Sequence, residues 1–258
     1  MRAEPAPATV PGAPRPRRRR LLPALVALML VALGAGLATL LRGEAPWAWG
    51  AAPEKSVTTT VPSGAGPAPE TRTTVVSDPL AAAGPWVATE DADEQASCRF
   101  AEESLWVRRE SAGSFRCRGP NRALPGNLRV EVNVRLISPG SCAALWLRFR
   151  PYRGYQVRVC ESVVLAGTHK DATARALRTF PLDTPVVANG PAARITVSTR
   201  DDVLEVTRDG RPVGTLPLTD PEITDGYLVL GIFTEPRAAG HTPPYAVAFN
   251  HVDVYGLS

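Results

Sequence analysis

An uninterrupted apolar stretch at residues 21–41 divides the chain into two parts that must fold in different surroundings. The stretch has the sequence LLPALVALMLVALGAGLATLL and contains no charged residue. At 1.5 Å per residue, a helix of this length spans roughly 30 Å, the thickness of the hydrocarbon core of a bilayer. Arg15 and Arg17–Arg20 come just before it, and basic flanks stay in the cytoplasm. We therefore predict an uncleaved transmembrane signal anchor, with residues 1–20 as a cytoplasmic basic tail and everything after Arg42 outside.

The alternative to an anchor is a cleaved signal peptide. Signal peptides have an apolar region of about 7–15 residues that ends in a small-x-small cleavage site. The stretch at 21–41 is longer, and no A-x-A motif closes it. Residues 42–85 are dominated by Ala, Pro, Gly, Ser and Thr, a composition typical of extended, disordered linkers. The sequence thus predicts one extracytoplasmic folded domain, residues 86–258, tethered to the cell membrane.

The net charge of the chain is concentrated in the predicted tail. The whole chain carries +4, whereas residues 1–20 contain six Arg and one Glu, which is +5. From Arg42 onward there are 23 basic and 24 acidic residues, which is −1. A nearly neutral outer domain does not have the basic surface that nucleic acids require. We therefore expect no nucleic-acid partner.

Apolar and polar residues alternate with a period of two through the predicted outer domain. In Leu128–Leu136, Leu and Val residues face one way and polar residues face the other, as in a half-buried strand. The segments 142–149 and 155–160 flank a turn and predict a β-hairpin. Further strands are expected at 193–199, 203–208, 212–216, 227–233 and 245–255. Because no long segment has a helical period, the pattern predicts an all-β sandwich or barrel.

The four cysteines all lie in this domain, at positions 98, 117, 142 and 160. On the oxidising side of a membrane an even number of cysteines favours disulfides, and the C-x2-4-C spacing of zinc sites is missing. If the hairpin turn centres near Pro151, residues whose numbers sum to 302 lie opposite each other, as Cys142 and Cys160 do. Opposed strand residues can approach to about 4.5 Å between Cα atoms, within disulfide range. We predict the pairs Cys142–Cys160 and, by remainder, Cys98–Cys117.

Three segments of the domain resemble a known group of sandwich domains. They are SCRFAEESLWVRRESAGSFRCRGP at 97–120, NLRVEVNVRL at 127–136 and CAALWLRFRPYRGYQVRVC at 142–160. Together they resemble extracytoplasmic concanavalin-like domains of single-pass bacterial membrane proteins, and are similar to laminin-G-like and 3-keto-disaccharide hydrolase-type sandwiches. The resemblance covers about residues 86–256. It implies a two-sheet antiparallel jelly-roll sandwich, often with a sugar-binding concave face.

The sequence offers little for catalysis. Glycosidases of a related sandwich fold place acids on one strand as E-x-D-x-E, and retaining hydrolysis needs two carboxyl groups about 5 Å apart. The nearest match, at 131–135, has only Glu131. There is no G-x-S-x-G motif, and the only histidines are His169, His241 and His251. We therefore predict no catalytic residue and a protein that is not an enzyme.

No cofactor or metal site is expected either. Acidic residues at 201–202 and 220–225 contain oxygen ligands that calcium could use. Solvated turns are the better explanation of these acids, so calcium is kept only as an alternative and no metal ligand is assigned.

Polar side chains on the predicted hairpin suggest a ligand face. Trp146, Arg148 and Arg150 are expected to share a face with Gln156 and Arg158 across the hairpin. Glu131 and Asn133 are expected on a neighbouring strand that faces the same way. An exposed Trp flanked by guanidinium and amide groups suits a sugar ring, because the indole stacks and the polar groups donate hydrogen bonds. The alternative is an ordinary solvated sheet face.

These observations lead to one functional prediction and two alternatives. We expect a membrane-anchored extracytoplasmic binding module that recognises a cell-envelope glycan or a membrane-protein partner. The first alternative is a carbohydrate-active hydrolase of the keto-disaccharide type. The second is a structural or assembly subunit of a membrane complex.

Overall fold

The computed structural model describes residues 71–258 except residue 172 and residues 235–239. The predicted tail (1–20), anchor (21–41) and most of the predicted linker lie outside this part of the chain. The described residues form fifteen strands and contain no helix. They therefore also contain no helix that could span a membrane.

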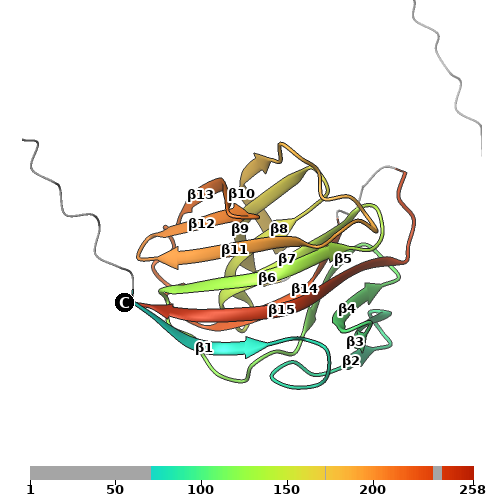
Figure 1. Cartoon of the computed structure of the whole chain (residues 1–258), viewed down its shortest axis with the longest axis horizontal. Helices are drawn as coiled ribbons and strands as arrows, with labels where there is room; N and C mark the ends of the chain where they lie inside the picture. Colours follow the sequence, from blue (N-terminus) through green and yellow to red (C-terminus); the bar gives the residue numbers. More distant parts are fainter. Residues whose placement is uncertain (1–70, 172, 235–239) are drawn as a thin grey trace, which may run out of the picture. The chain divides into compact units, whose positions relative to one another are not determined.

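The strands form two antiparallel sheets that pack face to face (Figure 1). The nine-stranded sheet runs in the order β13 (Arg211–Pro217), β12 (Val203–Arg208), β11 (Ala193–Arg200), β6 (Leu128–Leu136), β15 (Tyr245–Leu257), β4 (Ser104–Arg109), β3 (Ala96–Ala101) and β2 (Thr89–Asp91). Its ninth strand, β1 (Arg72–Asp78), pairs with the second half of β15, while β4 pairs with the first half. The six-stranded sheet runs in the order β10 (Thr173–Pro181), β9 (Val163–Lys170), β8 (Arg153–Val159), β7 (Ser141–Arg150), β14 (Tyr227–Thr234) and β5 (Gly113–Cys117).

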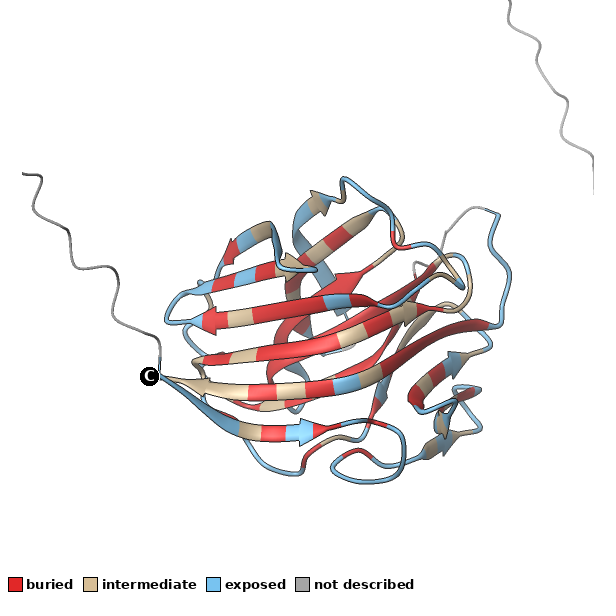
Figure 2. Cartoon of the chain, viewed as in Figure 1, coloured by how far each residue is buried: buried red, intermediate tan, exposed pale blue. Residues whose placement is uncertain are grey.

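The core lies between the two sheets and is built from alternate residues of each strand. Val130, Val132 and Val134 of β6 face Leu145 and Leu147 of β7 within one buried cluster. Figure 2 shows buried residues recurring along the strands of both sheets. Each fully buried aliphatic side chain contributes about 1.5–3 kcal/mol. The predicted two-sheet, all-β sandwich is confirmed.

The hairpin of β7 and β8 has the predicted register but contains a bulge. Ala144 lies opposite Arg158, and Trp146 lies opposite Gln156, so the residue numbers sum to 302. The register shifts between Leu147 and Arg150, where Arg148 has a φ of 48°. This bulge reverses the alternation along β7. Phe149 therefore packs with Trp146 on the outer side of the sheet and does not join Leu145 and Leu147 in the main core.

Both predicted disulfides are confirmed. Cys142–Cys160 closes the open end of the hairpin, with a Cα–Cα distance of 4.2 Å. Cys98–Cys117 links β3 to β5, with a Cα–Cα distance of 5.7 Å, and so joins the two sheets. No cysteine among the described residues is free.

The folded domain begins earlier than the sequence predicts. The predicted linker, 42–85, includes β1, and Val76 and Leu80 are buried in the core. The Pro79 carbonyl accepts a hydrogen bond from the amide of His251 in β15. The boundary near residue 85 is therefore wrong, because β1 forms the edge of the nine-stranded sheet.

Candidate functional site

The predicted ligand face is divided between two opposite surfaces. Glu131 and Asn133 belong to the nine-stranded sheet, whereas Trp146 and Gln156 belong to the six-stranded sheet. Each strand turns its apolar residues into the shared core, so the polar residues of β6 and β7 point away from each other. The prediction that they face the same way is wrong, because local alternation does not reveal which sheet a strand joins.

Glu131 is held in an ion-pair cluster on its own sheet. Its carboxylate accepts a hydrogen bond from Arg129 at 2.7 Å and is also paired with Arg194. Burial by itself would raise the pKa of Glu131, but the hydrogen bonds and charges of the two arginines outweigh it and lower the pKa. The carboxylate is therefore fully ionised and engaged at neutral pH.

Trp146 is buried, not exposed as predicted. Its relative exposure is 0 %, and its indole Nε1 donates a hydrogen bond to Nδ1 of His169 at 3.2 Å. The ring lies over Gly231 of β14, where an added Cβ would come within 3.0 Å of the indole. Because no face of the indole is open, Trp146 cannot stack on a sugar in this structure.

Gln156 and Arg158 lie beside Trp146 on the outer side of the six-stranded sheet and are also buried. The Arg158 guanidinium stands 4.2 Å from the ring centroid of Phe233. Gln156 is 2 % exposed, and its Nε2 has no hydrogen-bond partner. These two residues and Trp146 are the part of the predicted site that the structure brings together.

Arg148 and Arg150 have other roles because of the bulge. Arg148 is buried at one end of the sandwich, where its guanidinium donates to loop carbonyls of Gly126, Asp201 and Ile223. Arg150 forms an ion pair with Asp225. Neither arginine joins the Trp146 group.

An open cavity of about 640 Å³ lies next to this group, along β5 and β14. Phe149 connects the two, because it lines the cavity and also packs edge-on against Trp146 and His169. The Arg116 guanidinium stands 5.1 Å from the centroid of the Phe149 ring. The remaining walls combine apolar and polar groups, namely Pro85, Val87, Cys117, Arg118, Gly119, Pro120, Asn121, Tyr227, Leu228 and Val229.

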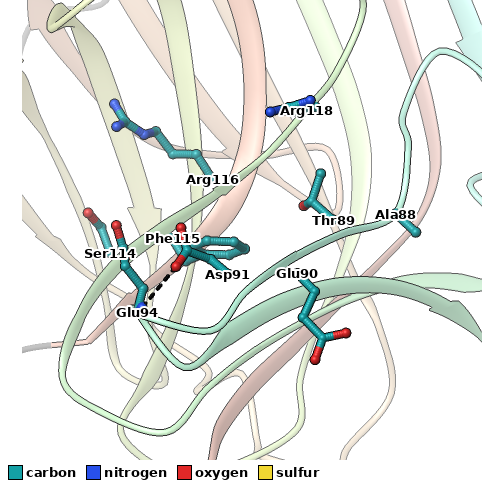
Figure 3. A pocket seen from close by; sticks show the side chains of 9 residues that line it. All are labelled: Ala88, Thr89, Glu90, Asp91, Glu94, Ser114, Phe115, Arg116 and Arg118. Atoms are coloured by element: carbon teal, nitrogen blue, oxygen red, sulfur yellow. Dashed lines mark hydrogen bonds between the residues drawn. The ribbon is translucent and has the colours of Figure 1, made fainter.

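A second cavity, of about 480 Å³, shares Arg116 and Arg118 with the first (Figure 3). Figure 3 shows Asp91 and Glu94 on the side of the cavity away from Arg118. We call the two neighbouring cavities the β5 trough. Its other lining residues on this side are Ala88, Thr89, Glu90, Ser114 and Phe115.

Alternation along β5 directs Arg116 outward, and Arg118 follows the last residue of the strand. Phe115 and Cys117 are buried, whereas Arg116 and Arg118 are exposed. Arg116 is exposed as a residue, but its guanidinium lies against Phe149 and is partly shielded from water, which lowers its pKa. The nearby carboxylate of Glu94 opposes this shift of the pKa, and the guanidinium stays charged. The disulfide at Cys117 fixes the strand between the two arginines.

The sequence analysis did not identify the β5 trough. A usable signal was present, because the segment SFRCR at 114–118 alternates apolar with basic residues. Tyr227 carries no comparable signal, since it reaches the cavity from β14, which only the tertiary fold brings next to β5.

Comparison with known proteins identifies the fold of the chain and assigns it to no family. No protein-family model and no curated protein matches the chain. Among solved structures, the chain is similar to the carbohydrate-binding module CBM66 from Bacillus subtilis, with 14 % identity and a TM-score of 0.51 over 65 % of this chain and 93 % of that one. It is also similar to a Bacillus licheniformis β-glucanase, with 11 % identity and a TM-score of 0.52 over 70 % and 97 %. A third is the catalytic domain of an endo-1,3-β-glucanase (laminarinase) from Thermotoga petrophila, with 14 % identity and a TM-score of 0.52 over 73 % and 99 %.

These similarities show a concanavalin-like, galectin-like sandwich. They also correct the prediction that the chain is not an enzyme, because glucanases share the fold with a binding module. Missing sequence motifs were therefore too weak a basis for excluding catalysis. At identities of 11–14 % the comparison establishes the fold only. The activity has to be argued from the residues of the site.

Proposed function

We propose that the chain is a membrane-anchored extracytoplasmic protein whose sandwich domain recognises a glycan at the β5 trough. The observation that carries the proposal is the cavity of about 640 Å³, which combines aromatic side chains with hydrogen-bond donors. Phe149 and Tyr227 supply ring surface, while Arg116, Arg118 and Asn121 supply donors. Small-molecule sites usually have volumes of about 300–1,000 Å³ and this mixed character.

Two features support a membrane anchor and an extracytoplasmic domain. The stretch at 21–41 has the length and hydrophobicity of a membrane span. The two disulfides support an oxidising compartment, since such bonds are rare in the cytosol. Extraction of bacterial membranes at alkaline pH tests the anchor, and release of the full-length protein into the soluble fraction would contradict it.

Glycan binding is tested by calorimetry on the full-length protein in detergent. The panel consists of laminarin, levan and polygalacturonate. We expect binding to at least one member and a clear loss with Tyr227→Ala. Tyr255→Ala is the matched control, because Tyr255 is on β15 of the nine-stranded sheet and does not line the cavity. No binding to any member, or equal loss in both variants, would refute the proposal.

A carbohydrate-active hydrolase is the second candidate, favoured by the carboxylates of Asp91 and Glu94 in the β5 trough and by the glucanases that share the fold. Retaining and inverting hydrolysis both need a pair of carboxyl groups across the scissile bond. Measuring new reducing ends in the same mixtures distinguishes the two functions. Release that stops with Glu94→Gln would make the protein a hydrolase.

A further inference from the structure

The charges around the β5 trough are unequal on its two sides. The lining of the larger cavity contains two charged residues, Arg116 and Arg118, and no Asp or Glu. Among the described residues neither arginine forms an ion pair with a carboxylate, and the Arg116 guanidinium lies against the ring of Phe149. A cavity with two exposed, unneutralised guanidiniums has a positive potential that favours anions.

The carboxylates of the smaller cavity cancel this potential only in part, because two of the three pair with other arginines. Glu90 pairs with Arg99 at 2.9 Å, and Glu94 pairs with Arg109 at 2.7 Å. Asp91 accepts a hydrogen bond from the backbone amide of Glu94 at 2.9 Å. Two of the three acidic charges are thus matched by other arginines. Only the charge of Asp91 is left to offset Arg116 and Arg118, so a net positive charge remains for a ligand.

The geometry of β5 suits an extended ligand. Arg116, in β5, and Arg118, just after it, both line the same two cavities. Two residues of extended chain separate their Cα atoms by roughly 7 Å. Each guanidinium can form two parallel hydrogen bonds with a carboxylate, which a neutral hydroxyl cannot match. The Phe149 ring beneath Arg116 restrains that side chain before a ligand arrives.

We propose that the glycan recognised at the β5 trough is acidic, with carboxylate groups on its sugars that bind Arg116 and Arg118. This inference rests on the proposed function and adds the chemical class of the ligand. The aromatic surface of Phe149 and Tyr227 contacts the sugar rings, and the two arginines select for charge.

The test compares two ligands that differ in charge and have the same backbone. The full-length protein is titrated with tetragalacturonate and with its fully methyl-esterified form at low salt. We expect the acid to bind at least about tenfold more tightly, a difference near 1.4 kcal/mol. The preference should shrink as salt is raised, because ions screen exposed charges.

Variants assign the effect to the β5 trough. In the double variant Arg116→Gln, Arg118→Gln, the acid and the ester should bind equally. The control is Arg175→Gln, Arg178→Gln, which removes two exposed arginines from the edge strand β10 and should keep the preference. An equal loss in both double variants would overturn the proposal, because the effect would then be general attraction by net charge.

The remaining outcomes separate this inference from the proposed function. Equal affinity for acid and ester, or binding of laminarin or levan without tetragalacturonate, would overturn the acidic ligand and leave glycan recognition standing. Failure of every glycan to bind would overturn both.

Discussion

Trp146 donates its indole N–H to Nδ1 of His169 across 3.2 Å, which ties β7 to β9 over the intervening strand β8. An indole nitrogen can only donate, so Nδ1 must be unprotonated and the ring proton is on Nε2. That nitrogen lies 2.8 Å from the backbone carbonyl of Asp171, to which it donates. The pair therefore fixes one neutral tautomer of a buried histidine and explains why Trp146 is unavailable to a ligand.

The first prediction concerns pH. Burial lowers the pKa of His169, the charge of Arg116 lowers it further, and Asp171 opposes them. Because the folded pKa lies below the unfolded value near 6.5, the unfolded chain binds more protons, and stability is lost as pH falls through 6.5. We expect Tm to drop between pH 7.5 and pH 5, and we expect His169→Gln to reduce that drop. His241→Gln, at an exposed site, should leave the drop in Tm as it is in the wild type. A drop in Tm that is the same in His169→Gln as in the wild type would contradict the prediction.

The second prediction is that Trp146 stabilises the fold and does not bind ligand. Trp146→Ala should lower the free energy of unfolding by about 3–5 kcal/mol, the usual cost of a buried aromatic. Trp146→Phe keeps most of the packing and loses the hydrogen bond to His169, so it should cost about 1 kcal/mol. Urea denaturation measures both. A Trp146→Phe protein with normal stability and abolished glycan binding would contradict the prediction, because it would show that the indole contacts the ligand.

Much of the fold follows from local patterns, for reasons visible in particular strands. β6 and β12 have the predicted bounds because their alternation is strict and turn residues flank them. The hairpin register fixes Cys142 opposite Cys160, and the other disulfide follows by remainder. β10 escaped prediction because it is an edge strand with almost every residue exposed or partly exposed, so no buried face imposes a pattern.

The site was less predictable because it depends on tertiary geometry. A positive φ at Arg148 turns Phe149 to the outer side of the sheet and Arg148 inward. No residue type in this segment predicts such a bulge. The sequence also does not show that the outer side of the six-stranded sheet is filled by its own side chains, such as Phe233 and Arg158. The prediction of exposure for Trp146 failed on that point.

The third prediction separates the two disulfides. They close loops of similar length, with sequence separations of 19 and 18, so each should contribute about 3 kcal/mol through the unfolded chain. Only Cys98–Cys117 holds the strand that carries Arg116. Replacing both its cysteines by Ala should weaken stability and glycan binding together, whereas the same change at Cys142 and Cys160 should affect stability alone. Equal binding by the two variants would show that β5 needs no such restraint.

The fourth prediction concerns Arg148 and its neighbour Arg150. Arg148→Met removes a donor from three loop carbonyls, of which that of Gly126 keeps a second donor in the Thr199 hydroxyl. We expect a loss of about 3 kcal/mol in unfolding free energy. Arg150→Met removes an exposed ion pair with Asp225, which should cost at most about 1 kcal/mol. Hydrogen exchange should quicken near residues 126, 201 and 223 only in the first variant. Similar costs in both variants would mean that Arg148 does not hold these loops together.

The fifth prediction tests where the domain begins. A chain that starts at residue 86 lacks β1, so the second half of β15 becomes an unpaired edge. It also loses the buried side chains of Val76 and Leu80, together about 3–6 kcal/mol. A chain that starts at residue 71 keeps both. We expect the longer chain to unfold at a clearly higher urea concentration, and the shorter one to be less soluble, since unpaired edges aggregate.

In the full-length protein, Leu80→Ala should reproduce part of the loss of stability, while Val87→Ala, at an exposed site, should not. Identical urea midpoints of unfolding for the two truncated chains would show that the folded domain begins near residue 86.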